Sequence, residues 1–325
     1  MGAYIIRRLL ISIPVLLGIT IIGFVALKLS PGDPLLVSVN PEVLANLSEN
    51  PELLEAERRR LGFDQPIFPN QYFRWLGNAV QGDLGYSITS KRLIVDEIAS
   101  RLPQTIYLMV TALTLAILIG IPIGLLSAVR QYSRTDYTLN ALAIFFASTP
   151  VFVLSLIGIY VFAVNLRILP TSEIHTVGRT DVPDAIWHLI LPAGVLAIVN
   201  AAPLVRYTRA SMLDVLHSEY VTTARSKGLP NRVVIIRHAL RNGLIPIITI
   251  IAWLAPEAVA GAVITEQIFA WGGIGQLAVK AASARDPSLM MGIILITGTA
   301  VLIANLVADI AYAIADPRVR YVRGT

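Results

Sequence analysis

Six long apolar stretches constrain the fold of this chain more than any other feature of its sequence. A helix needs about 20 mostly apolar residues to cross the roughly 30 Å hydrocarbon core of a bilayer. None of the stretches alternates between apolar and polar residues, as the strands of a membrane β-barrel do. The predicted spans are Leu9–Leu27, Gln104–Val129, Tyr137–Leu166, about Ala185–Val205, about Asn242–Ile268, and Pro287–Ala308 continuing to about Ala315.

The composition agrees with an all-α integral membrane protein with six transmembrane helices. Hydrophobic residues make up 55% of the 325 residues, charged residues only 14%, and the mean hydropathy is +0.68. Soluble domains carry about 25% charged residues. The chain has no cysteine, which excludes disulfides and thiol chemistry. The formal charge of +5 comes from basic residues that flank the apolar stretches, which favours lipid headgroups over nucleic acid as the anionic partner.

The positions of lysine and arginine predict the orientation, because these residues concentrate in cytoplasmic loops. With the N-terminus inside, Arg7, Arg8, Arg130 and Arg134 and the strongly basic segment 206–241 all face the cytoplasm. We therefore expect both termini to be cytoplasmic. The N-terminus also has the order of a signal peptide, but its apolar stretch is too long and no cleavage site follows promptly, so an uncleaved first span is the preferred interpretation.

The expected organisation has three parts. Residues 1–29 form the N-terminus and first span, residues 30–101 form an external segment, and residues 102–325 contain the other five spans. In the external segment, Glu55 and Arg59 lie one helical turn apart, which predicts a short surface helix.

Familiar catalytic and nucleotide-binding motifs are missing. The sequence has no H-E-x-x-H and no G-x-S-x-G, and no glycine is followed by lysine as a P-loop requires. We therefore expect no enzyme activity and no cofactor in this chain, so any ATP must be bound by another chain. A membrane enzyme is disfavoured for the same reason. An ion-coupled secondary transporter is the alternative function, although matching pairs of interrupted spans are not found in the two halves.

The basic segment 206–241 has the pattern of a short, sharply ended helix. Residues Ser211–Lys227 are compatible with a helix, Gly228 suits its C-terminal end, and Pro230 follows where a helix stops. Arg225 would complement the helix dipole. The alternative interpretation is a solvated basic loop attracted to anionic lipid.

The order of residues in this segment resembles the E-A-A loop of binding-protein-dependent ABC importer permeases, in the form typical of dipeptide and oligopeptide permeases. The residues that carry the resemblance are Glu219, Tyr220, Thr223, Ala224, Arg225 and Gly228. Other motifs are similar to the B-type subunit of that family along the whole chain. They include Leu29-Ser30-Pro31-Gly32-Asp33-Pro34, Gly82-Asp83-Leu84-Gly85-Tyr86-Ser87, Phe269-Ala270-Trp271-Gly272-Gly273-Ile274-Gly275 and Asp316-Pro317-Arg318-Val319-Arg320-Tyr321.

The resemblance implies a type I ABC importer permease fold in a bacterial-type inner membrane, with residues 206–241 as the coupling loop. It implies three kinds of protein partner besides lipid: a homologous C-type permease, two ATPase subunits that bind ATP and Mg²⁺, and an extracytoplasmic solute-binding protein. Members of the family move dipeptides, oligopeptides, nickel chelates, glutathione-like molecules, opines or oligosaccharides. The sequence of this chain does not select among them.

Two features inside the predicted spans have both a functional and a structural interpretation. Glu257 could line the solute path and attract a cationic group, or it could be a buried structural partner, because a carboxylate at membrane depth avoids lipid. Gly120, Pro122 and Gly124 in the second span and Pro150 in the third could be hinges, although such residues in spans more often permit close helix packing.

Overall fold

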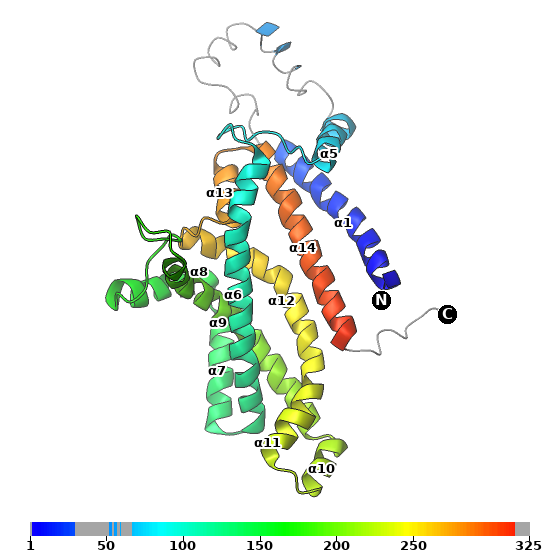
Figure 1. Ribbon diagram of the computed structural model, residues 1–325, viewed down its shortest axis with the longest axis vertical. Helices are drawn as coiled ribbons and strands as arrows, with labels where there is room; N and C mark the ends of the chain where they lie inside the picture. Colours follow the sequence, from blue (N-terminus) through cyan, green and yellow to red (C-terminus); the bar gives the residue numbers. More distant parts are fainter. Residues whose placement is uncertain (1, 30–51, 54, 57–58, 60–66, 316–325) are drawn as a thin grey trace. The chain divides into compact units, whose positions relative to one another are not determined.

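The computed structural model describes residues 2–29, 52–53, 55–56, 59 and 67–315, which form mainly helices joined by turns and loops (Figure 1). Within these ranges the only β pairing is an isolated bridge between Tyr86 and Leu93. The predicted all-α architecture is therefore confirmed. The chain folds as two compact units, the first formed by Met1–Ile5, Gln104–Gly272 and Val301–Thr325, the second by Ile6–Pro103 and Gly273–Ala300.

The helices follow one another along the chain with few long connections. They are α1 (Gly2–Leu29), α5 (Tyr72–Val80), α6 (Ile94–Val129), α7 (Arg134–Ser148), α8 (Val151–Gly158), α9 (Val182–Leu216), α10 (Glu219–Ser226), α11 (Asn231–Val233), α12 (Arg241–Ile268), α13 (Ile274–Ser283) and α14 (Pro287–Ala315). Wider π-type turns occupy Ile67–Gln71, Ile159–Asn165 and Val234–Leu240.

Four helices among the described residues, α1, α6, α9 and α14, are long and apolar enough to cross a membrane. The third predicted span is not one straight helix, because α7 and the segment Val151–Asn165 meet at 105°. The break falls at Thr149, whose backbone is extended (φ −88°, ψ 124°), as expected for a residue that precedes a proline. A second bent pair, Asn231–Leu244 and Pro246–Ala252, turns by 50°. Six spans result if each bent pair counts as one.

Helix α9 is the centre of the first unit and packs against α7, α8 and α12. It also packs against a row of buried small residues that lie four positions apart along α6. The row consists of Ala112, Ala116, Gly120, Gly124 and Ala128. A Cβ atom added to Gly120 would lie 2.6 Å from Leu204 Cβ, and one added to Gly124 would lie 2.6 Å from the Val205 carbonyl oxygen. The two glycines therefore permit close contact between α6 and α9, which supports the packing interpretation.

The second unit has a separate apolar core. Ile94, Ile98, Leu277 and Ile293 are buried together, and the Asp286 carboxylate accepts hydrogen bonds from Ser87 Oγ (2.6 Å), Thr89 N (3.1 Å) and Leu289 N (3.0 Å). The last of these bonds caps the first turn of α14.

The predicted surface helix of the external segment is described at only a few residues, where Arg59 Nη2 lies 3.8 Å from Glu55 Oε2. The rest of residues 30–66, including most of the motif Leu29–Pro34, lies outside the described residues, as does the C-terminal motif Asp316–Tyr321.

The close contact between α6 and α9 generates a prediction. Substitution Gly124→Ala places a methyl group 2.5 Å from Thr208 Cβ and against main chain, so the helices must move apart. We expect a loss of about 1–3 kcal/mol in stability, measured as a lower thermal unfolding midpoint of the detergent-solubilised protein.

The matched control is Gly194→Ala in α9, where an added Cβ meets no atom within 4 Å. This change should be neutral or stabilising by up to about 1 kcal/mol, because alanine favours helix over glycine. Equal midpoints for the two variants would contradict the close-packing assignment.

Candidate functional site

The segment that resembles a coupling loop forms the end of α9, then α10 and α11, and leads into α12 (Figure 1). The prediction of a continuous helix over Ser211–Lys227 is wrong, because α9 ends at Leu216 and α10 begins at Glu219. The break is local: Ser218 is extended (φ −71°, ψ 150°), and its hydroxyl donates to the Val215 carbonyl at 2.6 Å. Helix α10 is thus a separate element of eight residues.

One edge of α10 is fixed to the rest of the first unit. Val221 is fully buried and Ala224 is 7% exposed. They belong to one apolar cluster whose other buried members are Ala128 of α6, Met212 of α9, Val234 and Ala239. The sequence places Tyr220 one turn from Ala224, but the Tyr220 side chain is 42% exposed. Its hydroxyl accepts a hydrogen bond from Asn242 Nδ2 at 3.0 Å instead, so Val221 and Ala224 form the buried edge.

The opposite face of α10 is exposed and polar. Glu219 lies in the first turn and Arg225 in the last, where each charge complements the helix dipole. Thr223 is also exposed, and its hydroxyl donates to the Glu219 carbonyl at 2.9 Å. This face can therefore bind a partner while the buried edge holds the helix in place.

Gly228 ends the helix as predicted. Its φ of +75° is in the left-handed region, and its N–H donates to the Arg225 carbonyl at 3.0 Å. Residues other than glycine and asparagine rarely adopt this conformation.

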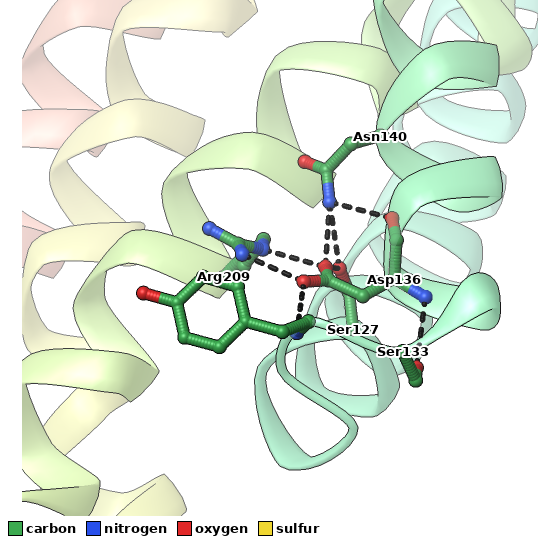
Figure 2. Close-up of polar contacts among 6 residues, drawn as sticks. Ser127, Ser133, Asp136, Asn140 and Arg209 are labelled. Atoms are coloured by element: carbon green, nitrogen blue, oxygen red, sulfur yellow. Dashed lines mark hydrogen bonds and ion pairs between the residues drawn. The ribbon is translucent and has the colours of Figure 1, made fainter.

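An ion pair between Arg209 of this segment and the buried Asp136 of α7 was missed by the sequence analysis (Figure 2). Arg209 of α9 donates from Nε to Asp136 Oδ1 and from Nη2 to Asp136 Oδ2, both at 2.7 Å. The Asp136 carboxylate, 1% exposed, also accepts from Ser127 Oγ (2.5 Å), Tyr132 N (3.0 Å) and Asn140 Nδ2 (2.7 Å). One carboxylate thus joins the end of α6, the following turn, α7 and α9.

Asp136 precedes the apolar part of α7, and its environment favours the charged form. The hydrogen bonds from the Arg209 guanidinium favour the ionised carboxylate, whereas burial disfavours it. The spacing of Ser133 and Asp136 is a capping signal, since the Asp136 N–H donates to Ser133 Oγ at 3.2 Å. That signal predicts where a helix starts, but it does not predict the contact between Asp136 and Arg209.

The other end of α9 has a second buried carboxylate. Asp184 accepts hydrogen bonds from the N–H and the hydroxyl of Thr176, both at 2.7 Å. His175 Nδ1 lies 3.4 Å and His188 Nε2 lies 3.9 Å from its oxygens. Among the described residues, no group of three His, Cys, Asp or Glu is arranged to hold a metal ion.

Of the two acidic residues of α12, the structure describes the side chain of only one. Glu257 lies within the helix, but its side chain is outside the described part of the chain. Glu266, which the sequence shows only as an interruption near the end of the span, is fully buried and accepts a hydrogen bond from Thr105 Oγ1 at 2.6 Å. This contact joins α12 to the part of α6 that lies in the same unit.

Comparisons with known proteins give a consistent picture. A model of the family described as binding-protein-dependent transport system inner membrane component matches residues 120–321, and the corresponding N-terminal family model matches residues 1–109. The oligopeptide transport system permease protein AppB of Bacillus subtilis is 45% identical over 99% of this chain and 100% of its own length.

Other similar proteins carry related names. A putative peptide permease protein of Brucella ovis is 43% identical over 98% of each chain. The glutathione transport system permease protein GsiC of Escherichia coli K12 is 36% identical over 98% of this chain and 99% of its own. A solved structure of the MetNI methionine ABC transporter in an inward-facing conformation has a TM-score of 0.57 at 14% identity, covering 67% of this chain and 96% of its own.

The backbone of Gly228 generates a prediction about α10. Substitution Gly228→Ala should destabilise the end of the helix by about 1–2 kcal/mol, because alanine resists a positive φ although no atom lies within 4 Å of its Cβ. Trypsin should then cleave after Arg225 and Lys227 about fivefold to thirtyfold faster.

Gly228→Asn is the control, because asparagine tolerates the left-handed region. It should retain slow cleavage. If both variants are cleaved at the same rate, the conformation of Gly228 does not hold the end of α10.

Proposed function

Because this chain belongs to the family of binding-protein-dependent transport system inner membrane components, we propose that α10 is the surface through which a separate ATPase drives it. The chain is a multi-pass membrane protein with the fold of a type I ABC importer permease. It is the permease subunit of a binding-protein-dependent importer and is not itself catalytic. Its family implies an ATPase partner and a solute-binding protein.

The construction of α10 carries the proposal. A helix that transmits movement must be stiff, short and unable to slide. The buried edge, Val221 and Ala224, prevents sliding, and the turns at Ser218 and Gly228 limit its length. Glu219, Tyr220, Thr223, Ala224, Arg225 and Gly228 are the residues to which we assign the coupling role. A cleft on the ATPase would receive the polar face, and closure of the ATPase would push on the buried edge.

The proposed assembly has this chain paired with a homologous C-type permease above two ATPase subunits. ATP and Mg²⁺ would bind the ATPases, in keeping with the lack of a P-loop in this sequence. In this proposal this end of the chain and both termini lie in the cytoplasm, and the basic residues around α10 support that orientation through the positive-inside rule. These residues are Arg206, Arg209, Arg225, Lys227, Arg232, Arg237 and Arg241. The binding protein would deliver solute on the opposite, external side.

Short peptides are the solutes that we propose. Relatives named for oligopeptide, peptide and glutathione transport support this class, since glutathione is itself a tripeptide. Glu257 would line the path, where its carboxylate could attract the amino terminus of a peptide. A carboxylate at membrane depth is costly unless it faces protein or a water-filled cavity.

The docking proposal predicts that Glu219→Ala weakens the complex with the ATPase, because Glu219 lies on the exposed face of α10. Co-purification of tagged chain with the ATPase should fall severalfold, and hydrolysis by the remaining complex should fall with it. Asp214→Ala is the control, since Asp214 is exposed on α9 outside the coupling helix. Unchanged co-purification by Glu219→Ala and by a triple substitution of Glu219, Thr223 and Arg225 would refute the assignment.

The path proposal predicts that Glu257→Gln slows uptake of a free tripeptide while assembly with the partners is unchanged. Proteoliposomes containing the complete transporter would measure uptake of trialanine and of N-acetyl-trialanine. Loss of the carboxylate should affect only the peptide with a free amino group. Equal rates for wild type and Glu257→Gln with trialanine would remove Glu257 from the path.

A further inference from the structure

We propose that the Asp136–Arg209 ion pair is the positioning element that makes α7 move together with α10 when the ATPase acts. The proposal rests on the coupling role proposed above for α10. In this proposal, Asp136 and Arg209 contact neither the solute nor the nucleotide. Their role is to transmit movement from the coupling helix α10 to α7, which α10 does not itself hold in place.

The contacts form a continuous path of two parallel branches. Ala128 and Met212 belong to the apolar cluster that contains the buried edge of α10. Ser127, the residue before Ala128, donates its hydroxyl to Asp136. Arg209, one helical turn before Met212, donates to both oxygens of the same carboxylate. Pressure on the buried edge of α10 therefore reaches Asp136 through α6 and through α9.

Helix α7 is the element that receives this movement. Asp136 lies in its first turn, and Asn140, one turn later, donates to the same carboxylate. Further along α7, its buried residue Ala143 packs with Ala202 and Val205 of α9. The helix ends at the 105° break before α8. A displacement of Asp136 would thus be carried along α7 to that break.

The geometry of the pair suits this task better than apolar packing does. Two parallel N–H···O bonds fix both the distance and the orientation of the guanidinium relative to the carboxylate. Apolar contacts have no preferred direction, whereas the two bonds of this pair define one. Figure 2 shows the guanidinium and the Ser127 and Asn140 side chains converging on the carboxylate from different elements. A lysine at position 209 would keep the charge and lose the two-bond geometry.

The experiment uses the complete transporter, with the partner permease and ATPases, in lipid nanodiscs. Spin labels would be attached to cysteines replacing Thr138 of α7 and Asp214 of α9, both exposed. Because the chain has no cysteine of its own, no native thiol of this chain must be removed first. Distances between the labels are measured without nucleotide and with ATP. Stimulation of ATP hydrolysis is measured with the cognate binding protein, purified with the solute it carries.

In the otherwise unchanged transporter we expect one narrow distance between the labels that ATP does not alter. Asp136→Asn should give a shifted or second distance with ATP, and stimulation should fall about fivefold or more, the range of a typical coupling between sites. Arg209→Lys should give an intermediate result. Asp184→Asn, the same change at the buried carboxylate at the opposite end of α9, should leave both readouts unaltered, even if it lowers the unfolding midpoint.

Wild-type distances and stimulation in both Asp136→Asn and Arg209→Lys would overturn the proposal. The proposal would also be overturned if Asp184→Asn changed the label distance and the stimulation as much as Asp136→Asn does, because the effect would then reflect general destabilisation. Failure of the proposed function has a different signature. In that case the unsubstituted chain would not bind the ATPases, or Glu219→Ala and the triple substitution would leave binding unchanged, whatever the Asp136 variants do.

Discussion

The lack of water in the hydrocarbon core is the constraint on which the rest of this structure depends. Each backbone N–H and C=O at membrane depth needs a partner, and a helix supplies one within the same segment. Polar side chains must likewise find partners or lie near the ends of the spans. The central helix α9 follows this rule, because its two strongest polar clusters, around Asp136–Arg209 and around Asp184, lie at its two ends. Between them the buried residues of α9 are mainly apolar and small.

The elements that could be predicted from the sequence are those governed by local chemistry. Apolar stretches of sufficient length located the spans, and Gly228 marked the end of α10 because a positive φ favours glycine. For the 105° bend in the third span, Pro150 offered a hinge as one interpretation, but packing was preferred because the stretch around it is continuously apolar. The gap between α9 and α10 was also missed, since nothing from Ser211 to Lys227 forbids a helix.

The ion pair shows what sequence reasoning cannot reach. Asp136 and Arg209 are separated by 73 positions, and each has an ordinary local interpretation as a helix start and as one of many basic residues. Only the packing of α7 on α9 brings them together. The residues of the coupling helix, by contrast, are contiguous, so their order alone carried the resemblance to a permease family. The family comparisons agree with that resemblance along nearly the whole chain.

The glycines of α6 also determine which relative motions are open to α6 and α9. A slide of one helical turn would bring Ala116 or Ala128 to a place now occupied by a glycine, where a methyl group has no room. The two helices therefore have a single register, without the neighbouring registers that a uniform alanine stripe would offer. A rearrangement that keeps this contact must therefore move the stretch 112–128 of α6 together with the facing part of α9, and it cannot slide one of them along the other.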